Sequence, residues 1–514
     1  MFDLHENKLH SIMLLILFFI IGCNNSNKKN EKPNVLFIAI DDMNDWIGPL
    51  GGNSMSKTPN LDKLAKRSVV FSNAHCTSPA CSPSRLSVMT GVLPHKSKVM
   101  DNQWYDGPKW REVPSLKNIE TIDQFFKNRG YKTLGGGKIY HSLAPPWTLM
   151  NQADPTGWDF YYPNINAPIP YQIRGKKEII DPDSFKGKRH KYFTWGPLEV
   201  DDKKMSDYHV VDWVISELEK EHDKPLFLAC GLFRPHMPWE VPKKYFKMFP
   251  LDSIKPLNIK ENDLEDAYDH GRRKWHKFVQ DNKQWKKVIQ AYLASIAFAD
   301  NQIGRVLKSL ENSKYSKNTI IILWSDHGMH IGEKENWEKF TLWEESTRVP
   351  LLINYPNMNQ KGIQCDEPVS LIDIYPTLTE LAGFNPPKHC DGESLMPQLK
   401  NIYIQRKKPA LTSFKFSSGE IGHSLRSKNF RYIYYRINNL EELYNHEIDP
   451  NEFENLAYLP KYKKTIEKFR KELFEKLELK NLKKKIFPPE EYTIYDGKIK
   501  KNGFKTISKI KNDL

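Results

Sequence analysis

The sequence predicts an α/β protein with a large sheet flanked by helices, followed by a smaller α+β domain. Three unbroken apolar runs, at residues 35–40, 226–231 and 319–324, have the length and composition of strands buried on both faces. Ligands bind beyond the carboxyl ends of strands in open α/β sheets, so polar residues following these runs predict one shared site. The three polar clusters are Asp41-Asp42, Arg234-Pro235-His236 and Asp326-His327-Gly328.

Helical patterns lie between these runs. Thr58 followed by Pro59 is typical of a helix start, because threonine caps a helix and proline fits its first position. Apolar residues recur at helical spacing over residues 289–310, which predicts a long helix before the strand at 319–324. The stretches 105–120 and 143–200 are rich in Pro, Trp, Tyr and Gly without a clear period, as binding loops are.

The pattern changes near residue 400. Residues 424–435 and 440–444 alternate like short strands, and residues 461–479 follow with a helical pattern. We therefore expect a main domain at 33–400, a small α+β domain at 401–480 and a basic tail at 481–514.

Composition and charge limit the classes of partner. The chain has 514 residues, of which 27% are charged and 39% hydrophobic, as in a globular protein of two or three domains. The net charge is +14, but much of it lies in terminal runs such as Lys483-Lys484-Lys485, which we interpret as a solvated tail. The sequence carries no zinc-finger, RNP or basic-helix pattern, so we expect no nucleic-acid partner.

The N-terminus resembles an export signal. Residues 12–21 form an apolar run that suits a signal peptide but is too short to span a bilayer. The run ends in Ile20-Ile21-Gly22-Cys23, which resembles a bacterial lipobox. We expect a lipoprotein signal peptide at 1–22, a lipid on Cys23 that anchors the protein at the periplasmic or outer membrane, and a tether at 23–32. The alternative is an ordinary cleaved signal and a soluble periplasmic or secreted protein.

Four further cysteines have no assigned chemistry. An exported protein permits disulfides, and Cys365 with Cys390 is the pair that we favour among the alternatives. Cys76 is left unassigned, whereas Cys230 lies in an apolar run and is expected to be simply buried.

The segment Cys81-Ser82-Pro83-Ser84-Arg85 is the sharpest chemical feature of the sequence. Pro83 suits the first turn of a helix, so Cys81 is expected at the positive N-terminal end of that helix. From the residues alone, Cys81 is a structural cysteine, a thiolate nucleophile or a modified residue. A lone cysteine before a helix is more often structural.

The pattern Cys-x-Pro-x-Arg resembles the signature of the sulfatases, in which this cysteine is oxidised to formylglycine. Other segments with the same resemblance are residues 34–42, 121–141, 233–239, 325–350 and 441–457. The iduronate-2-sulfatase-like group is the most similar. Lys334 departs from the histidine that many members carry, a difference expected to concern substrate contacts.

The resemblance implies an alkaline-phosphatase-like sandwich at 33–400 that performs sulfate-ester hydrolysis. It also implies one metal site, with a formylglycine at position 81 adding an oxygen ligand. Hard carboxylate oxygens suit Ca²⁺ or Mg²⁺ better than zinc, and we expect one Ca²⁺. The implied metal ligands are Asp41, Asp42, Cys81 as formylglycine, Asp326 and His327.

The resemblance further assigns roles to six residues. Hydrated formylglycine at position 81 attacks sulfur, while Arg85 and Lys138 hold the hydrate. His141 resembles the base that releases sulfate. His236 and Lys339 are expected to bind the sulfate and to protonate the leaving oxygen. Conversion of Cys81 implies a partner, either a formylglycine-generating enzyme or an anaerobic sulfatase-maturing enzyme.

Several alternatives stay open at this level. Phosphatases of the same fold use Thr or Ser and typically two zinc ions, which the Cys81 motif argues against. An inactive surface carbohydrate-binding protein is a second alternative, and an arylsulfatase or a choline-sulfatase-like hydrolase is a third. We expect a sulfated carbohydrate derived from a polysaccharide as substrate. Seven aromatic residues could stack on sugars or belong to the core: Trp104, Tyr105, Trp110, Trp147, Trp158, Tyr161 and Tyr162.

Overall fold

The structure of the chain is a computed structural model. It describes residues 32–102, 109–141, 153–164, 166–169, 193–271, 273–479, 492–495 and 498–501. Within these ranges no helix is long and apolar enough to cross a membrane. The predicted signal peptide and nearly all of the predicted tether, including Cys23, lie outside the described residues.

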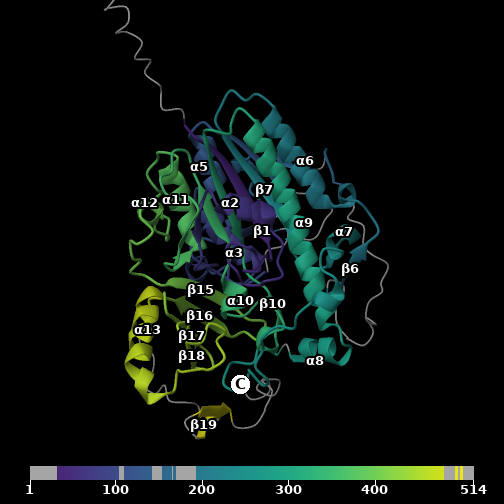
Figure 1. Cartoon of the computed structure of the whole chain (residues 1–514). Helices are drawn as coiled ribbons and strands as arrows, with labels where there is room; N and C mark the ends of the chain where they lie inside the picture. Colours follow the sequence, from purple (N-terminus) through teal and green to yellow (C-terminus); the bar gives the residue numbers. More distant parts are fainter. Residues whose placement is uncertain are drawn as a thin grey trace, which may run out of the picture.

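The centre of the molecule is an eight-stranded mixed sheet (Figure 1). Strand β1 (Asn34–Asp41) lies between β7 (Leu226–Pro235) and β9 (Thr319–Ser325), and it is parallel to both. These are the three strands that the apolar runs predict. The sheet continues through β4 (Lys132–Gly137) and β5 (Phe160–Tyr162) on one side, and through β12 (Leu351–Asn354), β2 (Val69–Phe71) and β13 (Ile363–Cys365) on the other.

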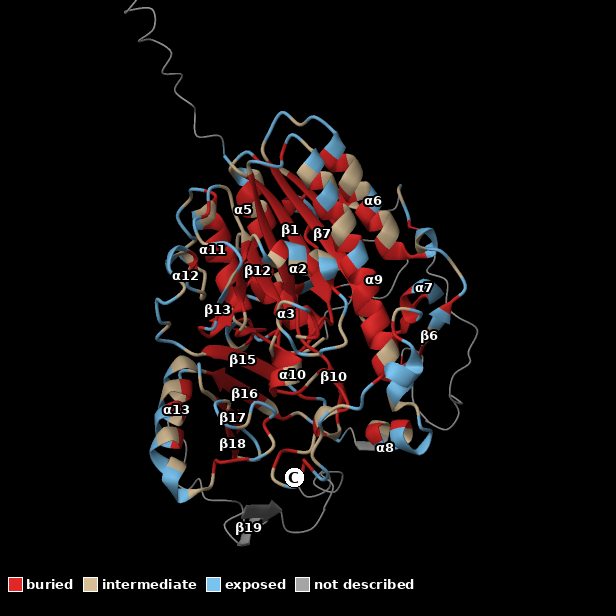
Figure 2. Cartoon of the chain, viewed as in Figure 1, coloured by how far each residue is buried: buried red, intermediate tan, exposed pale blue. Residues whose placement is uncertain are grey.

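Helices cover both faces of this sheet, because its central strands are apolar on both sides (Figure 2). Alternate β1 residues such as Ile38 pack in one core with α2 (Pro59–Ala65), α6 (Ser206–Glu219) and α9 (Trp285–Asn312). The intervening residues, such as Phe37, pack in a second core with α3 (Cys81–Thr90), α5 (Ile122–Asn128) and α11 (Ile374–Leu381). The predicted α/β class with a large mixed sheet is confirmed.

Short elements connect these layers. They are β3 (Ala74–His75), α4 (Pro94–Ser97), β6 (Trp195–Leu198), β8 (Trp239–Pro242), α7 (Lys243–Phe246), α8 (Arg273–Asp281), β10 (His330–Ile331), β11 (Trp337–Glu338), α10 (Glu344–Thr347), β14 (Val369–Ser370) and α12 (Met396–Lys400).

A four-stranded antiparallel sheet with one helix along it forms the C-terminal part (Figure 1). Its strands are β15 (Ala410–Lys415), β16 (Ile421–Arg426), β17 (Phe430–Tyr435) and β18 (Leu440–Asn445), followed by α13 (Lys463–Lys476). Arg431 joins this sheet to the main part through buried ion pairs with Glu344 and Glu452. In the predicted tail, β19 (Tyr492–Tyr495) pairs with β20 (Lys498–Lys501).

The favoured disulfide is wrong. Cys365 and Cys390 are both free, as are the other described cysteines. Cys365 ends β13, and its Sγ lies 3.7 Å from the carbonyl oxygen of Ile402. Cys390 instead packs against Gly91, so the sulfurs belong to different contacts. Cys230 is buried in β7 as expected.

Candidate active site

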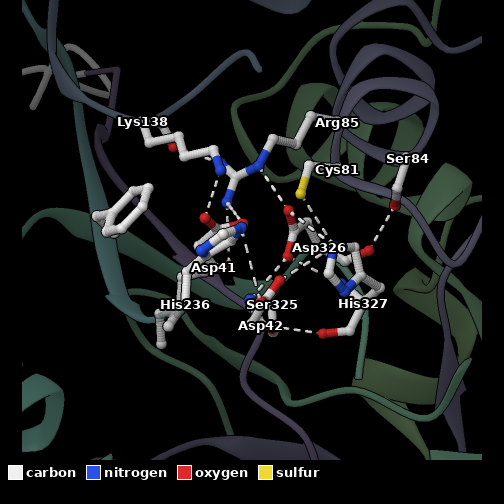
Figure 3. Close-up of polar contacts among 12 residues, drawn as sticks. Asp41, Asp42, Cys81, Ser84, Arg85, Lys138, His236, Ser325, Asp326 and His327 are labelled. Atoms are coloured by element: carbon white, nitrogen blue, oxygen red, sulfur yellow. Dashed lines mark hydrogen bonds and ion pairs between the residues drawn. The ribbon is translucent and has the colours of Figure 1, made fainter. Parts of the chain in front are cut away.

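The three polar clusters meet beyond the carboxyl ends of β1, β7 and β9 (Figure 3). Asp41 ends β1 and Asp42 follows it, while Asp326 and His327 follow β9. His236 comes directly after β7. Because the strands are parallel neighbours, side chains almost 300 positions apart in the sequence share one buried cluster of polar groups.

Cys81 is the first residue of α3, where the helix presents its positive end. Its Sγ lies 3.2 Å from Nε2 of His327 and 3.6 Å from Nζ of Lys339. Burial raises the pKa of the Cys81 thiol, but the positive charges of Lys138, Lys339 and His327 outweigh it and lower the pKa well below 9.0. Position 81 therefore lies in an electropositive environment that stabilises an anion.

Four of the five predicted metal ligands form a compact group. Asp41, Asp42, Cys81 and His327 are buried, and their ligand atoms lie within 4.8 Å of one another. Oδ2 of Asp42 is buried and has no hydrogen-bond partner among the described residues. A buried carboxylate oxygen without a donor is costly unless a cation binds it. Two carboxylates in this group fit a hard divalent cation.

Asp326, the fifth predicted ligand, lies beside this group and is hydrogen-bonded to it. Its Oδ2 accepts a hydrogen bond from Nε of Arg85 at 2.7 Å, and its Oδ1 accepts one from the backbone N–H of Asp42 at 3.2 Å. The Arg85 guanidinium also donates to the carbonyl oxygens of Ile40 and Ile139. The observed contacts of Arg85 therefore fix the carboxylates and the backbone around them.

Two lysines neutralise the aspartates. Nζ of Lys138 donates to Oδ2 of Asp41, and Nζ of Lys339 donates to Oδ1 of Asp42 at 2.6 Å. Burial raises the pKa of Asp41, but Lys138, His236 and Arg85 outweigh it and hold the pKa far below 3.8. The carboxylate of Asp41 is thus ionised, as a metal ligand must be.

Lys138 reaches the site because glycine precedes it. Gly137 has a φ of 74°, and a Cβ there would lie 1.9 Å from the carbonyl oxygen of Gly231 on β7. Only glycine fits this close approach, which turns the chain at the end of β4 towards Asp41.

The three histidines of the site differ in their surroundings. Burial lowers the pKa of His141 to about 4, so this imidazole, which is hydrogen-bonded to Cys81, is neutral near pH 7. Burial also lowers the pKa of His327, but Asp326 and the Cys81 sulfur raise it to about 9. The side chain of His236 is 21% exposed, with Nδ1 2.6 Å from the carbonyl oxygen of Met237 and Nε2 3.8 Å from Oδ2 of Asp42.

All ten predicted site residues therefore lie in one place, but some supporting residues were missed. Ser84, Ser325 and Tyr292 bond the backbone of the site, and no motif in the sequence identifies them. Lys334, in contrast, is buried and bonds Oδ1 of Asp263 at 3.2 Å. The lysine that stands where many family members carry histidine therefore forms an internal ion pair.

The aromatic residues divide as follows. Trp110, Trp158 and Tyr161 are buried in the second core, so for them the core interpretation holds. Tyr162 is half-buried and stacks on Trp213. The other three lie outside the described residues: Trp104, Tyr105 and Trp147.

A mixed sheet between helical layers, with carboxylates and lysines at its strand ends and a cysteine at the start of a helix beside them, defines a hydrolase of the alkaline-phosphatase-like fold. The Sulfatase family matches residues 33–384, and the family described as N-sulphoglucosamine sulphohydrolase, C-terminal, matches residues 332–479. The chain belongs to the sulfatase family and is a sulfuric ester hydrolase.

Individual relatives agree with this membership. A sulfatase of Formosa agariphila is 36% identical over 88% of this chain and 90% of that protein. Iduronate 2-sulfatase of Mus musculus is 30% identical over 76% of each chain. A solved structure described as a 2-O GAG sulfatase has a TM-score of 0.66 at 20% identity, covering 87% of this chain and 92% of that one, which shows a shared fold.

Proposed function

We propose that this sulfatase uses a formylglycine at position 81 and one Ca²⁺ ion to hydrolyse sulfate esters of a carbohydrate. The observation that carries the proposal is the position of Cys81 at the start of α3, with its sulfur beside His327 and Lys339 and within the Asp41–Asp42 group. Neither a structural cysteine nor a simple thiolate nucleophile accounts for two carboxylates gathered around it.

Calcium is the cation that best fits the donor set. Asp41 and Asp42 would hold it through carboxylate oxygens, with Oδ2 of Asp42 as the oxygen that no donor occupies. Asp326 and His327 would complete the site, together with oxygen at position 81. When bound, the cation would lower the proton affinity of a hydrated aldehyde at position 81, whose hydroxyl would be the nucleophile toward sulfur.

The chain's own residues then divide the remaining work. Lys339 supplies positive charge for the sulfate oxygens, because its Nζ lies between Asp42 and position 81. His236, the most exposed of the site's ionisable groups, delivers a proton to the leaving oxygen. His141 takes up the proton of the position-81 hydroxyl when sulfate departs. Lys138 and Arg85 hold Asp41 and Asp326 in place throughout.

The names of relatives support a carbohydrate substrate. One relative is an iduronate 2-sulfatase and one solved structure is a 2-O GAG sulfatase. Both names refer to sulfate on sugars, so we infer a sulfated oligosaccharide derived from a polysaccharide. Arylsulfatase activity or choline-sulfatase activity is the alternative within the same chemistry.

The two-zinc phosphatase alternative needs a second metal site, and the described residues contain no second group of metal ligands beside Asp41 and Asp42. The other potential ligand group among the described residues is Glu344, His446 and Glu452. Arg431 already bonds both of its carboxylates, so this group links α10 to the C-terminal sheet without needing a cation.

We further propose that the protein is exported and anchored through lipid on Cys23, facing the periplasm or the outer membrane. The apolar run followed by Gly22-Cys23 supports this location. A maturation enzyme, either formylglycine-generating or of the anaerobic type, would act on Cys81 before folding buries it.

A panel of desulfation assays on defined sulfated oligosaccharides tests the function. The wild type should release sulfate from at least one sugar, and the Cys81→Ala variant should release essentially none. Full activity in Cys81→Ala would refute the nucleophile. Binding of the oligosaccharides without any sulfate release by fully converted protein would favour the inactive carbohydrate-binding alternative.

A further inference from the structure

The metal-ligand residue Asp42 has a backbone conformation that side chains rarely adopt. Its φ is 60°, in the left-handed region. A residue other than glycine is strained there, and it stays there only where surrounding groups hold it. The position of the Asp42 carboxylate, whose Oδ2 accepts no hydrogen bond from the described residues, therefore depends on the groups that fix this turn.

Three side chains bind the three successive backbone N–H groups of the turn. Oδ1 of Asp326 accepts from Asp42 at 3.2 Å, and Oγ of Ser325 accepts from Met43 at 3.0 Å. The hydroxyl of Tyr292 accepts from Asn44 at 3.1 Å.

Tyr292 also binds the other side of the turn. Its hydroxyl donates to the carbonyl oxygen of Asp42 at 2.8 Å, so one oxygen closes the turn from both ends. Of the three side chains, Tyr292 is the one that comes from a helix, α9, and not from the segment that carries Asp326 and His327. The turn is thereby tied to a second layer of the fold.

Tyr292 itself has no freedom to move. Its side chain is buried, and its ring lies at 5.4 Å from that of Trp46 and at 5.6 Å from that of Trp239. Trp239 starts β8, three residues after His236. Burial raises the pKa of Tyr292 well above 10.0, so the hydroxyl keeps the proton that it donates.

We propose that Tyr292 is a positioning residue for the metal site: its hydroxyl holds the left-handed turn that aims Asp42 at the cation. The proposal rests on the calcium site of the proposed function. Without the hydroxyl, the carbonyl of Asp42 and the N–H of Asn44 lose a buried partner. The turn then relaxes when no cation is bound, and binding must restore the strained conformation.

The test is calcium binding by the full chain, measured by titration calorimetry with Ca²⁺ alone after removal of bound metal. The Tyr292→Phe variant keeps the ring between its two tryptophans and removes only the hydroxyl. Loss of groups that orient metal ligands lowers affinity about 10- to 100-fold, and we expect a loss in that range. Tyr375→Phe is the matched control. Tyr375 lies on α11, is also buried, and also donates its hydroxyl to a backbone carbonyl oxygen, that of Glu120 at 3.1 Å.

The outcomes separate the inference from the function on which it rests. Weaker calcium binding by Tyr292→Phe, with Tyr375→Phe like the wild type, supports the positioning role. Unchanged affinity in Tyr292→Phe overturns it, even if melting in chelator shows that the variant is less stable, because the hydroxyl would then be only structural. A wild-type chain that binds no calcium overturns the calcium site itself, and the positioning role with it.

Discussion

Replacing His236 by alanine tests whether this side chain protonates the leaving oxygen or only binds the sulfate. A sugar alkoxide is a strong base and leaves only with a proton, whereas an activated phenoxide leaves without one. Positioned acids contribute about 100- to 10,000-fold, so we expect kcat on a sugar sulfate to fall by that factor. That corresponds to about 3–5.5 kcal/mol of transition-state stabilisation. On an activated aryl sulfate the loss should stay below about tenfold.

The structure indicates that this loss is chemical and not a consequence of unfolding. The His236 side chain is partly exposed, and its hydrogen bond goes to the neighbouring carbonyl of Met237, which water can reach after truncation. Stability should therefore change by about 1 kcal/mol or less. The assay compares kcat for both substrates in the wild type, in His236→Ala and in the control His209→Ala on α6. Equal losses on both substrates would refute the acid role.

Three further outcomes follow from the same structure. Asp42→Asn should weaken calcium binding by about 100-fold or more and shrink the calcium-induced rise in melting temperature, since a direct ligand loses its charge; unchanged calcium binding would contradict the ligand set. Arg431→Met removes the guanidinium that two buried carboxylates share, leaving Glu344 with Arg426 and Glu452 with His446, and should cost up to about 3–5 kcal/mol in urea unfolding. Burial raises the pKa of Glu452, but Arg431 and His446 bring it down to about 2, so in the wild type its contribution is complete above pH 4.5 and is lost as pH falls towards 2; in Arg431→Met the pKa is lowered less, so less stability should be lost as pH falls below 4.5. Cys23→Ser should release the protein from membrane fractions or block its processing, and a wild type found wholly in the soluble fraction would contradict the lipid anchor.

The sequence predicted the main strands and the site residues because both depend on local patterns. The buried strands β1, β7 and β9 are continuous apolar runs, and the polar residues at their ends follow directly in the chain. Parallel pairing of neighbouring strands then brings those ends together without further information. The Cys81 motif likewise contains its own helix signal, because Pro83 lies in the first turn of α3.

Contacts between distant segments could not be predicted in this way. Tyr292 lies 250 positions from Asp42, and Lys334 lies 71 positions from Asp263. Neither pair has a spacing that predicts contact. The favoured pairing of Cys365 with Cys390 failed for the same reason, since closeness in sequence does not place two sulfurs within bonding distance.

The central claim is that the residue at position 81 works as formylglycine. The most direct measurement is mass spectrometry of the peptide that contains Cys81, made on preparations matured to different extents and assayed in parallel for sulfate release. We expect the thiol-bearing side chain to be replaced by an aldehyde in active protein, and sulfate release to rise in proportion to the converted fraction. Full activity in a preparation whose Cys81 remains an unmodified thiol would contradict the account.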